Sequence, residues 1–126
     1  MTTKKTVAVI GASADRSKFG NKSVRAHLAQ GWEVYPVHPA GGEIEGLAAF
    51  RSVAEIPVHL DRVSMYVPPS VGEKLLPAIA AAAPAELFIN PGAESDELVS
   101  AARGLGLDPI LACSIVAIGT TPAAFE

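Results

Sequence analysis

One stretch near the N-terminus, residues 6–13 (TVAVIGAS), limits the possible folds more than any other part of the chain. Four apolar residues, 7–10, run without interruption into Gly11, which is typical of a strand that is buried on both faces and ends in a sharp turn. A polar loop over residues 14–20 and a helical segment over residues 21–30 follow. In such an arrangement, free amide groups and the positive end of the helix dipole converge on the turn. The sequence therefore predicts an anion site at this turn, with phosphate as the expected anion.

The rest of the chain alternates between strand and helix patterns. Further strands are expected over residues 32–37, 62–67, 87–90 and 109–112, and further helices over residues 70–83 and from 95 to 104 or 106. Strands that alternate with helices favour an open, mainly parallel sheet covered on both faces. A chain of 126 residues has the size of one domain. We therefore expect a single domain, residues 1–126, with a Rossmann-like three-layer α/β/α fold.

Two helices carry more detailed expectations. In the first, Val24 and Leu28 are four residues apart, which predicts that both face the core. Ser95 is expected to start the last long helix, because Asp96 and Glu97 follow it and suit the positive end of a helix.

Two further helix starts carry the spacing of a capping box, in which a serine is followed three residues later by a glutamate. Ser52 with Glu55 predicts a single helical turn, and Ser70 with Glu73 predicts the start of the helix over residues 70–83. Pro77 lies inside that helix and is expected to kink it, because proline has no backbone N–H to donate.

Composition excludes several classes of function. The net charge is -3 and the isoelectric point is near 5.6, so no general positive field would hold a nucleic-acid backbone. The longest apolar stretch, residues 75–85, is short for a membrane span and contains Pro77 and Pro84. Residues 1–5 lead directly into the first strand, which leaves no room for a signal peptide. We expect no nucleic-acid partner, no membrane association and a cytoplasmic location.

Few residues offer catalytic or metal-binding chemistry. The single cysteine, Cys113, excludes an internal disulfide and a zinc site made of thiolates. His27, on the first helix, is expected to be a packing or surface residue. The predicted strand ends supply neither a serine, histidine and acid grouping nor a pair of carboxylates. We therefore expect no catalytic residues and no metal site.

The loop after the first strand also limits the choice of nucleotide. A dinucleotide-binding loop normally reads GxGxxG and is paired with an acidic residue at the end of the second strand. This loop reads GASADRSKFG, and the second strand ends in Val37, His38 and Pro39 with no carboxylate. The pattern weighs against NAD. It leaves open a ligand with an extra phosphate near its ribose, which would suit Lys18 or Arg16.

Several of these segments together resemble one family. VAVIGAS, HLAQGWEVYPVHP, EIEGLAAFRSVAEIP, VPPS and a single cysteine after the last strand look like the small stand-alone CoA-binding proteins. Their domain is similar to the CoA-binding domain of the succinyl-CoA synthetase α subunit. The resemblance covers nearly the whole chain, from Val7 to about Cys113, and implies a Rossmann-like fold that binds coenzyme A.

The resemblance also implies a set of contacts, carried over by position. The pyrophosphate would meet Gly11, Ala12 and Ser13, and Lys18 would meet a phosphate. The adenosine part would lie by His38 and Pro39, and Val67, Pro68 and Pro69 would line the wall of the site. The pantetheine side would be formed by Asn90, Pro91 and Gly92.

Three functions stay open at this point. The synthetase needs a domain with a phosphorylated histidine and a partner subunit, and this chain ends before either, so a non-catalytic CoA (or acyl-CoA) binder is the first expectation. The alternatives are a fragment of an NADP-type oxidoreductase and a regulatory subunit that docks to an acyl-CoA enzyme, although no protein partner can be named. Cys113 is expected either to be a buried side chain or to exchange thiols with CoA.

Overall fold

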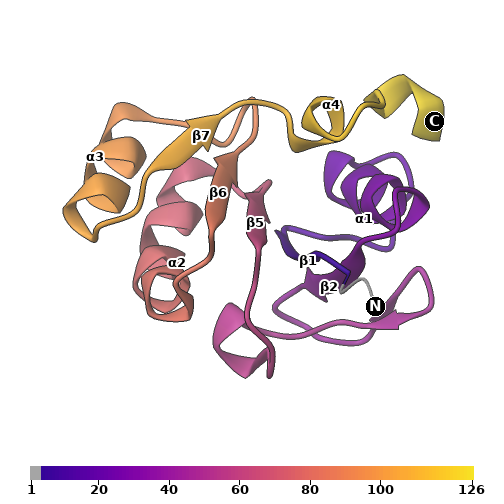
Figure 1. Ribbon diagram of the computed structural model, residues 1–126, viewed down its shortest axis with the longest axis horizontal. Helices are drawn as coiled ribbons and strands as arrows, with labels where there is room; N and C mark the ends of the chain where they lie inside the picture. Colours follow the sequence, from indigo (N-terminus) through magenta and orange to yellow (C-terminus); the bar gives the residue numbers. More distant parts are fainter. Residues whose placement is uncertain (1–3) are drawn as a thin grey trace.

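Five parallel strands form one sheet in the order β2-β1-β5-β6-β7, and helices cover it on both sides (Figure 1). The computed structural model describes residues 4–126. The strands of the sheet are β1 Thr6–Ile10, β2 Glu33–Val37, β5 Arg62–Met65, β6 Glu86–Ile89 and β7 Pro109–Leu111. The helices are α1 Phe19–Ala29, α2 Pro69–Ala82, α3 Asp96–Gly104 and α4 Ser114–Ala117. The expected Rossmann-like α/β fold is confirmed.

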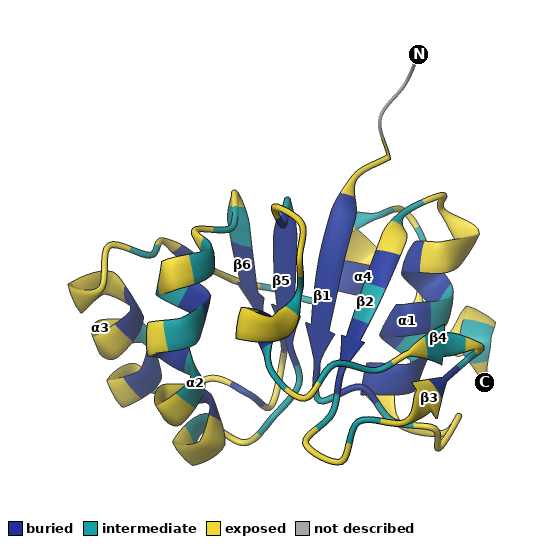
Figure 2. Cartoon of the chain, turned by 90° about the horizontal axis from the view of Figure 1, so that it is seen from below, coloured by how far each residue is buried: buried dark blue, intermediate teal, exposed yellow. Residues whose placement is uncertain are grey.

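The two faces of the sheet bury different sets of side chains. Strand β1 is buried along its whole length: Ala8 and Ile10 belong to the core beneath α2 and α3, whereas Val7 and Val9 belong to the core beneath α1. Figure 2 shows the buried strands between the two helical layers, whose outer surfaces are exposed. Burial on both faces explains why residues 7–10 of β1 form an unbroken apolar run, since none of them is more than 2% exposed.

Helix α1 begins two residues earlier than expected and buries a different stripe of side chains. Val24 is fully buried as expected, but Leu28 is 38% exposed, so the prediction for Leu28 was wrong. The buried stripe instead runs through Gly20, Ser23, Val24 and His27. These positions are spaced by three and four residues, as one helix face requires, but three of them are not aliphatic and the hydrophobic pattern missed them.

The starts of the other helices test the predicted caps. The Ser95 hydroxyl accepts a hydrogen bond from Leu98 N at 3.0 Å, so the predicted start of α3 is confirmed. The capping box predicted for Ser70 was wrong, because α2 begins at Pro69 and has no side-chain cap. Proline fits the first turn of a helix because its missing N–H would have no partner there. Helix α2 continues through Pro77 to Ala82.

Some short elements carry no strong sequence pattern. Strands β3 Glu43–Ile44 and β4 Leu47–Ala48 form a small antiparallel hairpin, which is followed by the 3-10 turn η1 Val53–Glu55. Ser52 caps that turn as predicted, its hydroxyl accepting from Ala54 N at 3.2 Å. After β7, the chain forms α4 and a second 3-10 turn, η2 Pro122–Phe125, which lies beside α1 (Figure 1).

The winding of the chain reverses at one place along the carboxyl edge of the sheet. From β1 the chain moves outward to β2 on one side, and after a crossover it continues through β5, β6 and β7 on the other side. The winding therefore reverses between the carboxyl ends of β1 and β5. In open parallel sheets, ligands bind at such a switch point.

Candidate functional site

The turn after β1 requires glycine for two reasons. Gly11 has a φ of +87°, a conformation that side chains with a Cβ rarely adopt. A Cβ at this position would also lie 3.1 Å from the backbone carbonyl carbon of Tyr66, the first residue after β5. Gly11 therefore lets the chain turn sharply while it stays in close contact with the neighbouring strand end.

Gly20 lets helix α1 approach this turn more closely than any other residue could. A Cβ on Gly20 would lie only 2.1 Å from the carbonyl oxygen of Gly11, a distance that no real Cβ occupies. The first turn of α1 thus packs backbone to backbone against the end of β1. This contact was not predicted from the sequence, because the two glycines are nine positions apart and do not form the familiar GxGxxG pattern.

The loop between the two glycines is ordered by its own side chains. Ser13 Oγ accepts a hydrogen bond from Asp15 N at 3.0 Å. Asp15 Oδ1 in turn accepts from Ser17 Oγ, at 2.6 Å, and from Ser17 N, at 3.0 Å. These hydrogen bonds from the Ser17 hydroxyl and amide lower the pKa of the Asp15 carboxyl. The only acidic side chain in this loop is therefore held by the loop itself.

Two side chains of α1 hold the loop from behind. Asn21 is fully buried, and its Nδ2 donates to Ser13 O at 2.8 Å. Arg25 Nη2 donates to Arg16 O at 2.8 Å and also to Phe125 O, in the C-terminal segment, at 2.6 Å. Arg25 Nε donates to Asn21 Oδ1 at 2.7 Å, which joins the two supports. The loop conformation is therefore held by hydrogen bonds within the chain.

The start of α1 is open to an anion. Lys18 is the N-cap residue, its side chain makes no capping hydrogen bond, and the first turn contains no acidic residue. The free amide groups and the positive end of the helix dipole are thus not neutralised by a side chain. This arrangement agrees with the anion site predicted from the sequence.

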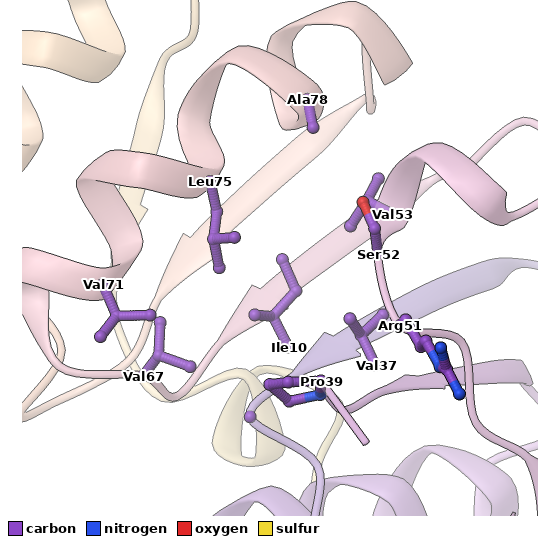
Figure 3. Close-up of a pocket in the computed structure, with 11 residues that line it drawn as sticks. Ile10, Val37, Pro39, Arg51, Ser52, Val53, Val67, Val71, Leu75 and Ala78 are labelled. Carbon is purple, nitrogen blue, oxygen red and sulfur yellow. The ribbon is translucent and has the colours of Figure 1, made fainter. Parts of the chain in front are cut away.

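An apolar cleft lies on one side of Gly11 (Figure 3). It lies between the carboxyl ends of β1 and β2, one face of α2 and the segment at the start of η1. Its walls are mainly aliphatic, with Ile10, Val37, Val53, Val67, Val71 and Leu75 among them, and its polar side chains are Arg51 and Ser52. A flat, weakly polar ring system fits such walls.

A second and more polar cleft lies on the other side of Gly11. It lies between the start of α1, the end of β5 and the loop after β6. Its lining includes Lys18, Gly20, Tyr66, Pro91 and Gly92. Gly11 lines both clefts. One extended ligand could therefore cross from the apolar cleft to the polar cleft over the glycine turn.

The structure brings some of the predicted site residues to these clefts and not others. Residues that line a cleft are Gly11, Pro39, Val67, Lys18, Pro91 and Gly92. Ala12 is buried beneath the turn, and Ser13 uses its hydroxyl within the loop. The His38 ring accepts a hydrogen bond from Ala40 N at 3.1 Å, in its own turn. Pro68 and Pro69 form the start of α2 beside the apolar cleft rather than its lining.

Asn90 faces inward. Its side chain is buried, with Nδ2 donating to Ser64 Oγ and to Met65 O, both at 2.9 Å. Its Oδ1 accepts from Ser114 N at 2.8 Å, at the start of α4. The amide is fully used in joining β5, β6 and α4. Asn90 therefore supports the shape of the pantetheine side predicted for residues 90–92, and its side chain is not exposed to a ligand.

Tyr66 is a lining residue that the sequence analysis missed. Its hydroxyl lies 3.0 Å from Ser114 Oγ, which is itself 2.7 Å from Ser64 Oγ. Burial raises the pKa of the Tyr66 phenol, although the hydrogen bond with Ser114 opposes this shift. The phenol therefore stays protonated at neutral pH. Arg51 was also missed, because nothing in its local sequence shows that it lies beside a cleft.

Cys113 is the N-cap residue of α4 and is half-buried. It follows β7 at the carboxyl edge of the sheet, as expected, but it is not among the residues that line the two clefts. Thiol exchange at Cys113 therefore stays a prediction.

A cluster at the opposite, amino end of the sheet shows where His27 lies. His27 is fully buried, its Nδ1 donates to Ser23 O at 2.8 Å, and its ring meets Trp32 edge-on. Burial lowers its pKa to about 4, so the ring is neutral. Arg62 lies between the rings of Trp32 and Phe88, with guanidinium to centroid distances of 4.6 and 4.3 Å. The cluster is internally paired, and His27 is a packing residue, as predicted.

The described part of the chain adds two negative findings. Within residues 4–126, no three His, Cys, Asp or Glu side chains are grouped as metal ligands. In the same range, no helix has the length and apolar character needed to cross a bilayer.

Fold and site together define a class of protein: a Rossmann-like α/β domain with a glycine turn and an uncapped helix start at its switch point. Comparison with known proteins identifies the family. The family model described as a CoA binding domain matches residues 5–119, and the chain therefore belongs to this family. The resemblance found in the sequence is confirmed.

Curated relatives of this chain are larger proteins. The α subunit of the ADP-forming acetate–CoA ligase I of Pyrococcus furiosus is 35% identical over 136 residues, covering 94% of this chain and 29% of that protein. The α subunit of ligase II of the same organism is 42% identical over 65 residues, covering 49% of this chain and 14% of that protein. The chain thus spans less than a third of the length of these relatives.

Solved structures show the same fold. A conserved hypothetical protein from Pyrococcus furiosus matches with a TM-score of 0.80 at 35% identity, covering 91% of this chain and 99% of that chain. A protein from Thermus thermophilus matches with a TM-score of 0.81 at 30% identity, covering 90% and 87%. The acetyl-coenzyme A synthetase 1 of Ca. Korarchaeum cryptofilum matches with a TM-score of 0.74 at 26% identity, covering 86% of this chain and 25% of that chain.

Proposed function

We propose that this protein is a non-catalytic binder of coenzyme A or an acyl-CoA. The observation that carries the proposal is the pair of clefts that meet at Gly11, one apolar and one polar. CoA has the same order of parts: an aromatic base at one end, charged phosphates in the middle and a polar pantetheine arm at the other end. Membership of the CoA-binding domain family supports the same ligand.

The pyrophosphate would lie at the glycine turn. The open start of α1 supplies amide donors and a positive dipole, and Lys18 adds a cation at the same place. Gly11 and Gly20 let the turn, the start of α1 and the end of β5 pack closely together, so that all three border the polar cleft. The adjoining residues Ala12 and Ser13 complete the turn.

The adenosine part would occupy the apolar cleft, between Pro39 and Val67. His38 follows the end of β2, between the lining residues Val37 and Pro39, and Pro68 and Pro69 form the start of α2. The pantetheine arm would extend along the polar cleft past Tyr66, Pro91 and Gly92. Both ends of CoA would thus lie along the carboxyl edge of the sheet.

The polar groups along the strand ends support binding without catalysis. The hydroxyls of Ser64, Tyr66 and Ser114 bond to one another, and the Asn90 amide completes the network. In this network no base stands beside a serine to activate it, and the Tyr66 phenol stays protonated because burial raises its pKa. We therefore assign no reaction to the chain itself, and a specific acyl-CoA would differ from CoA only beyond the thiol.

Calorimetric titration with CoA, NAD and NADP tests the proposal. We expect CoA to bind most tightly, because β2 ends at Val37 and is followed by His38 and Pro39, which supply no carboxylate for an unmodified ribose. NADP is the informative competitor, since it also has an extra phosphate on its adenosine ribose, at the 2′ rather than the 3′ position, but lacks the pantetheine arm. Tighter binding of NAD or NADP than of CoA would contradict the proposal and favour an oxidoreductase fragment.

A further inference from the structure

Among residues 4–126, Arg51 is the only charged residue that lines the apolar cleft (Figure 3). Its side chain lies across Gly41, because a Cβ on Gly41 would be 3.4 Å from Arg51 Nε and 3.6 Å from Arg51 Cγ. Its backbone N–H donates to Glu55 Oε1 at 2.9 Å, which fixes the residue at the start of η1. Arg51 thus lies at the rim of the cleft, with its guanidinium directed past Gly41 rather than into the apolar interior (Figure 3).

The Arg51 guanidinium has no acidic partner within residues 4–126. The ion pairs in that range join Arg16 to Glu45 and Arg62 to Glu86. Arg25, by contrast, donates from Nη2 to Arg16 O in the loop and to Phe125 O in the C-terminal segment. A guanidinium presents a planar set of donors that matches the oxygens of a phosphate. Because Arg51 is exposed and has no ion-pair partner in this range, its guanidinium is free to bind a phosphate.

The two cations at the site stand on opposite sides of the glycine turn. Lys18 lines the polar cleft with the start of α1, whereas Arg51 lines the apolar cleft with Val37 and Pro39. A ligand that crosses Gly11 would meet the two cations with different parts. The end of the ligand next to Arg51 is the end whose ring would occupy the apolar cleft.

We infer that Arg51 binds the 3′-phosphate on the ribose of CoA and makes the site selective for CoA over dephospho-CoA. The inference rests on the proposed function and assigns Lys18 to the pyrophosphate. It predicts that the two cations read different phosphates of one ligand, so that their removal has different consequences.

The test is a calorimetric comparison of CoA and dephospho-CoA on the full chain and on the variants Arg51→Ala and Lys18→Ala. We expect Arg51→Ala to weaken CoA binding about tenfold or more and to leave the affinity for dephospho-CoA within about twofold. Lys18→Ala should weaken both ligands by a similar factor, because both contain the pyrophosphate. Arg51→Lys should recover part of the preference for CoA, since it keeps the charge but not the planar donor set.

The outcomes separate this inference from the proposed function. Equal losses of CoA and dephospho-CoA in Arg51→Ala, or no loss of either, would overturn the role of Arg51 while leaving CoA binding intact. A preference that disappears in Lys18→Ala instead would move the 3′-phosphate to Lys18. Failure of the unmodified protein to bind both ligands would overturn the proposed function and this inference together. Arg51 is exposed, so loss of the fold is not expected, and a thermal melt of each variant checks it.

Discussion

Helices α1 and α3 both begin at the carboxyl edge of the sheet, but their first turns are built in opposite ways. The start of α3 is closed by the protein: Ser95 Oγ accepts from Leu98 N, and Asp96 and Glu97 stand at the positive end of the helix. The start of α1 has Lys18 at its N-cap, with no side-chain cap and no acid in its first turn. At the start of α3 the protein's own side chains neutralise the positive end of the helix. At the start of α1 they do not, so a ligand anion can bind there.

The difference shows how a fold can separate stability from function at equivalent positions. A cap such as Ser95 contributes about 1 kcal/mol to stability. Helix α1 lacks that contribution at its own start, yet Asn21 and Arg25 brace the preceding loop from the other side. The proposed anion site is thus supported by contacts behind it, while the start of the helix stays uncapped.

The largest expected effect is at Gly20, where the start of α1 touches the turn after β1. Gly20→Ala would force a methyl group against Gly11 O, so we expect a loss of roughly 2 to 3 kcal/mol in the free energy of unfolding, together with loss of CoA binding. Thermal melts and calorimetric titration measure the two losses. Gly104→Ala is the matched control, because a Cβ at this helical glycine meets nothing within 4 Å and alanine favours helices. Equal behaviour of the two variants would refute the close approach of α1.

Lys18→Ala should change binding and leave stability nearly unaltered. Lys18 is exposed and contributes no cap, so the free energy of unfolding should shift by less than about 0.5 kcal/mol. Loss of a charge-assisted contact to phosphate should weaken CoA binding by roughly 1.5 to 3 kcal/mol, one to two powers of ten. Lys74→Ala, on the exposed face of α2, serves as the control. If both lysine variants bind CoA like the unmodified protein, Lys18 is a solvated side chain only.

Ser95→Ala reverses the pattern at the other helix start. It removes the bond to Leu98 N, so we expect α3 to lose about 1 kcal/mol of stability in urea denaturation. CoA affinity should stay the same, because Ser95 lines neither of the two clefts. A weaker CoA titration in this variant would show that the two helix starts do not have separate roles.

The smallest expected effect concerns Cys113, at the start of the short helix α4. Here the first helical amide, Ser114 N, is already bonded to Asn90 Oδ1. A Cys113 thiolate that reaches CoA disulfide would attack one sulfur, form a mixed disulfide and release one CoA thiolate. Intact mass should then show one CoA adduct that reductant removes and that Cys113→Ser lacks. An adduct of equal size on Cys113→Ser, or none on the unmodified protein, would leave Cys113 a structural residue.

The sequence predicts the strands of the sheet well, because parallel strands that are buried on both faces consist of unbroken apolar residues. Residues 7–10 are buried on both faces, so they carry an unbroken hydrophobic pattern, and Gly11 marks the point where the strand must turn. The predicted strand ends therefore fall at the correct edge of the sheet. Ser95 was recognisable as a cap because the signal is local, within three residues of the chain.

The missed features depend on contacts between distant segments. The fit of Gly20 against Gly11 needs the helix to be folded back on the turn, and no spacing rule for nine residues expresses it. In the sequence Asn90 is simply a polar residue at a strand end, yet its side-chain amide forms hydrogen bonds with Ser64 and Ser114, which belong to other elements. Arg51 sits beside the apolar cleft only because the segment before η1 crosses the end of β2. Local sequence patterns carry no information about these contacts between distant segments.

The most direct test of the open helix start is a titration of the ¹⁵N-labelled protein with CoA, followed by amide chemical shifts. We predict that the largest shifts occur at Gly11 and Gly20, on either side of the loop that leads into α1. Amides at the capped start of α3, from Asp96 to Leu98, should move little and serve as the internal reference. Saturation with CoA that shifts the α3 amides most, or leaves Gly11 and Gly20 unmoved, would contradict the account.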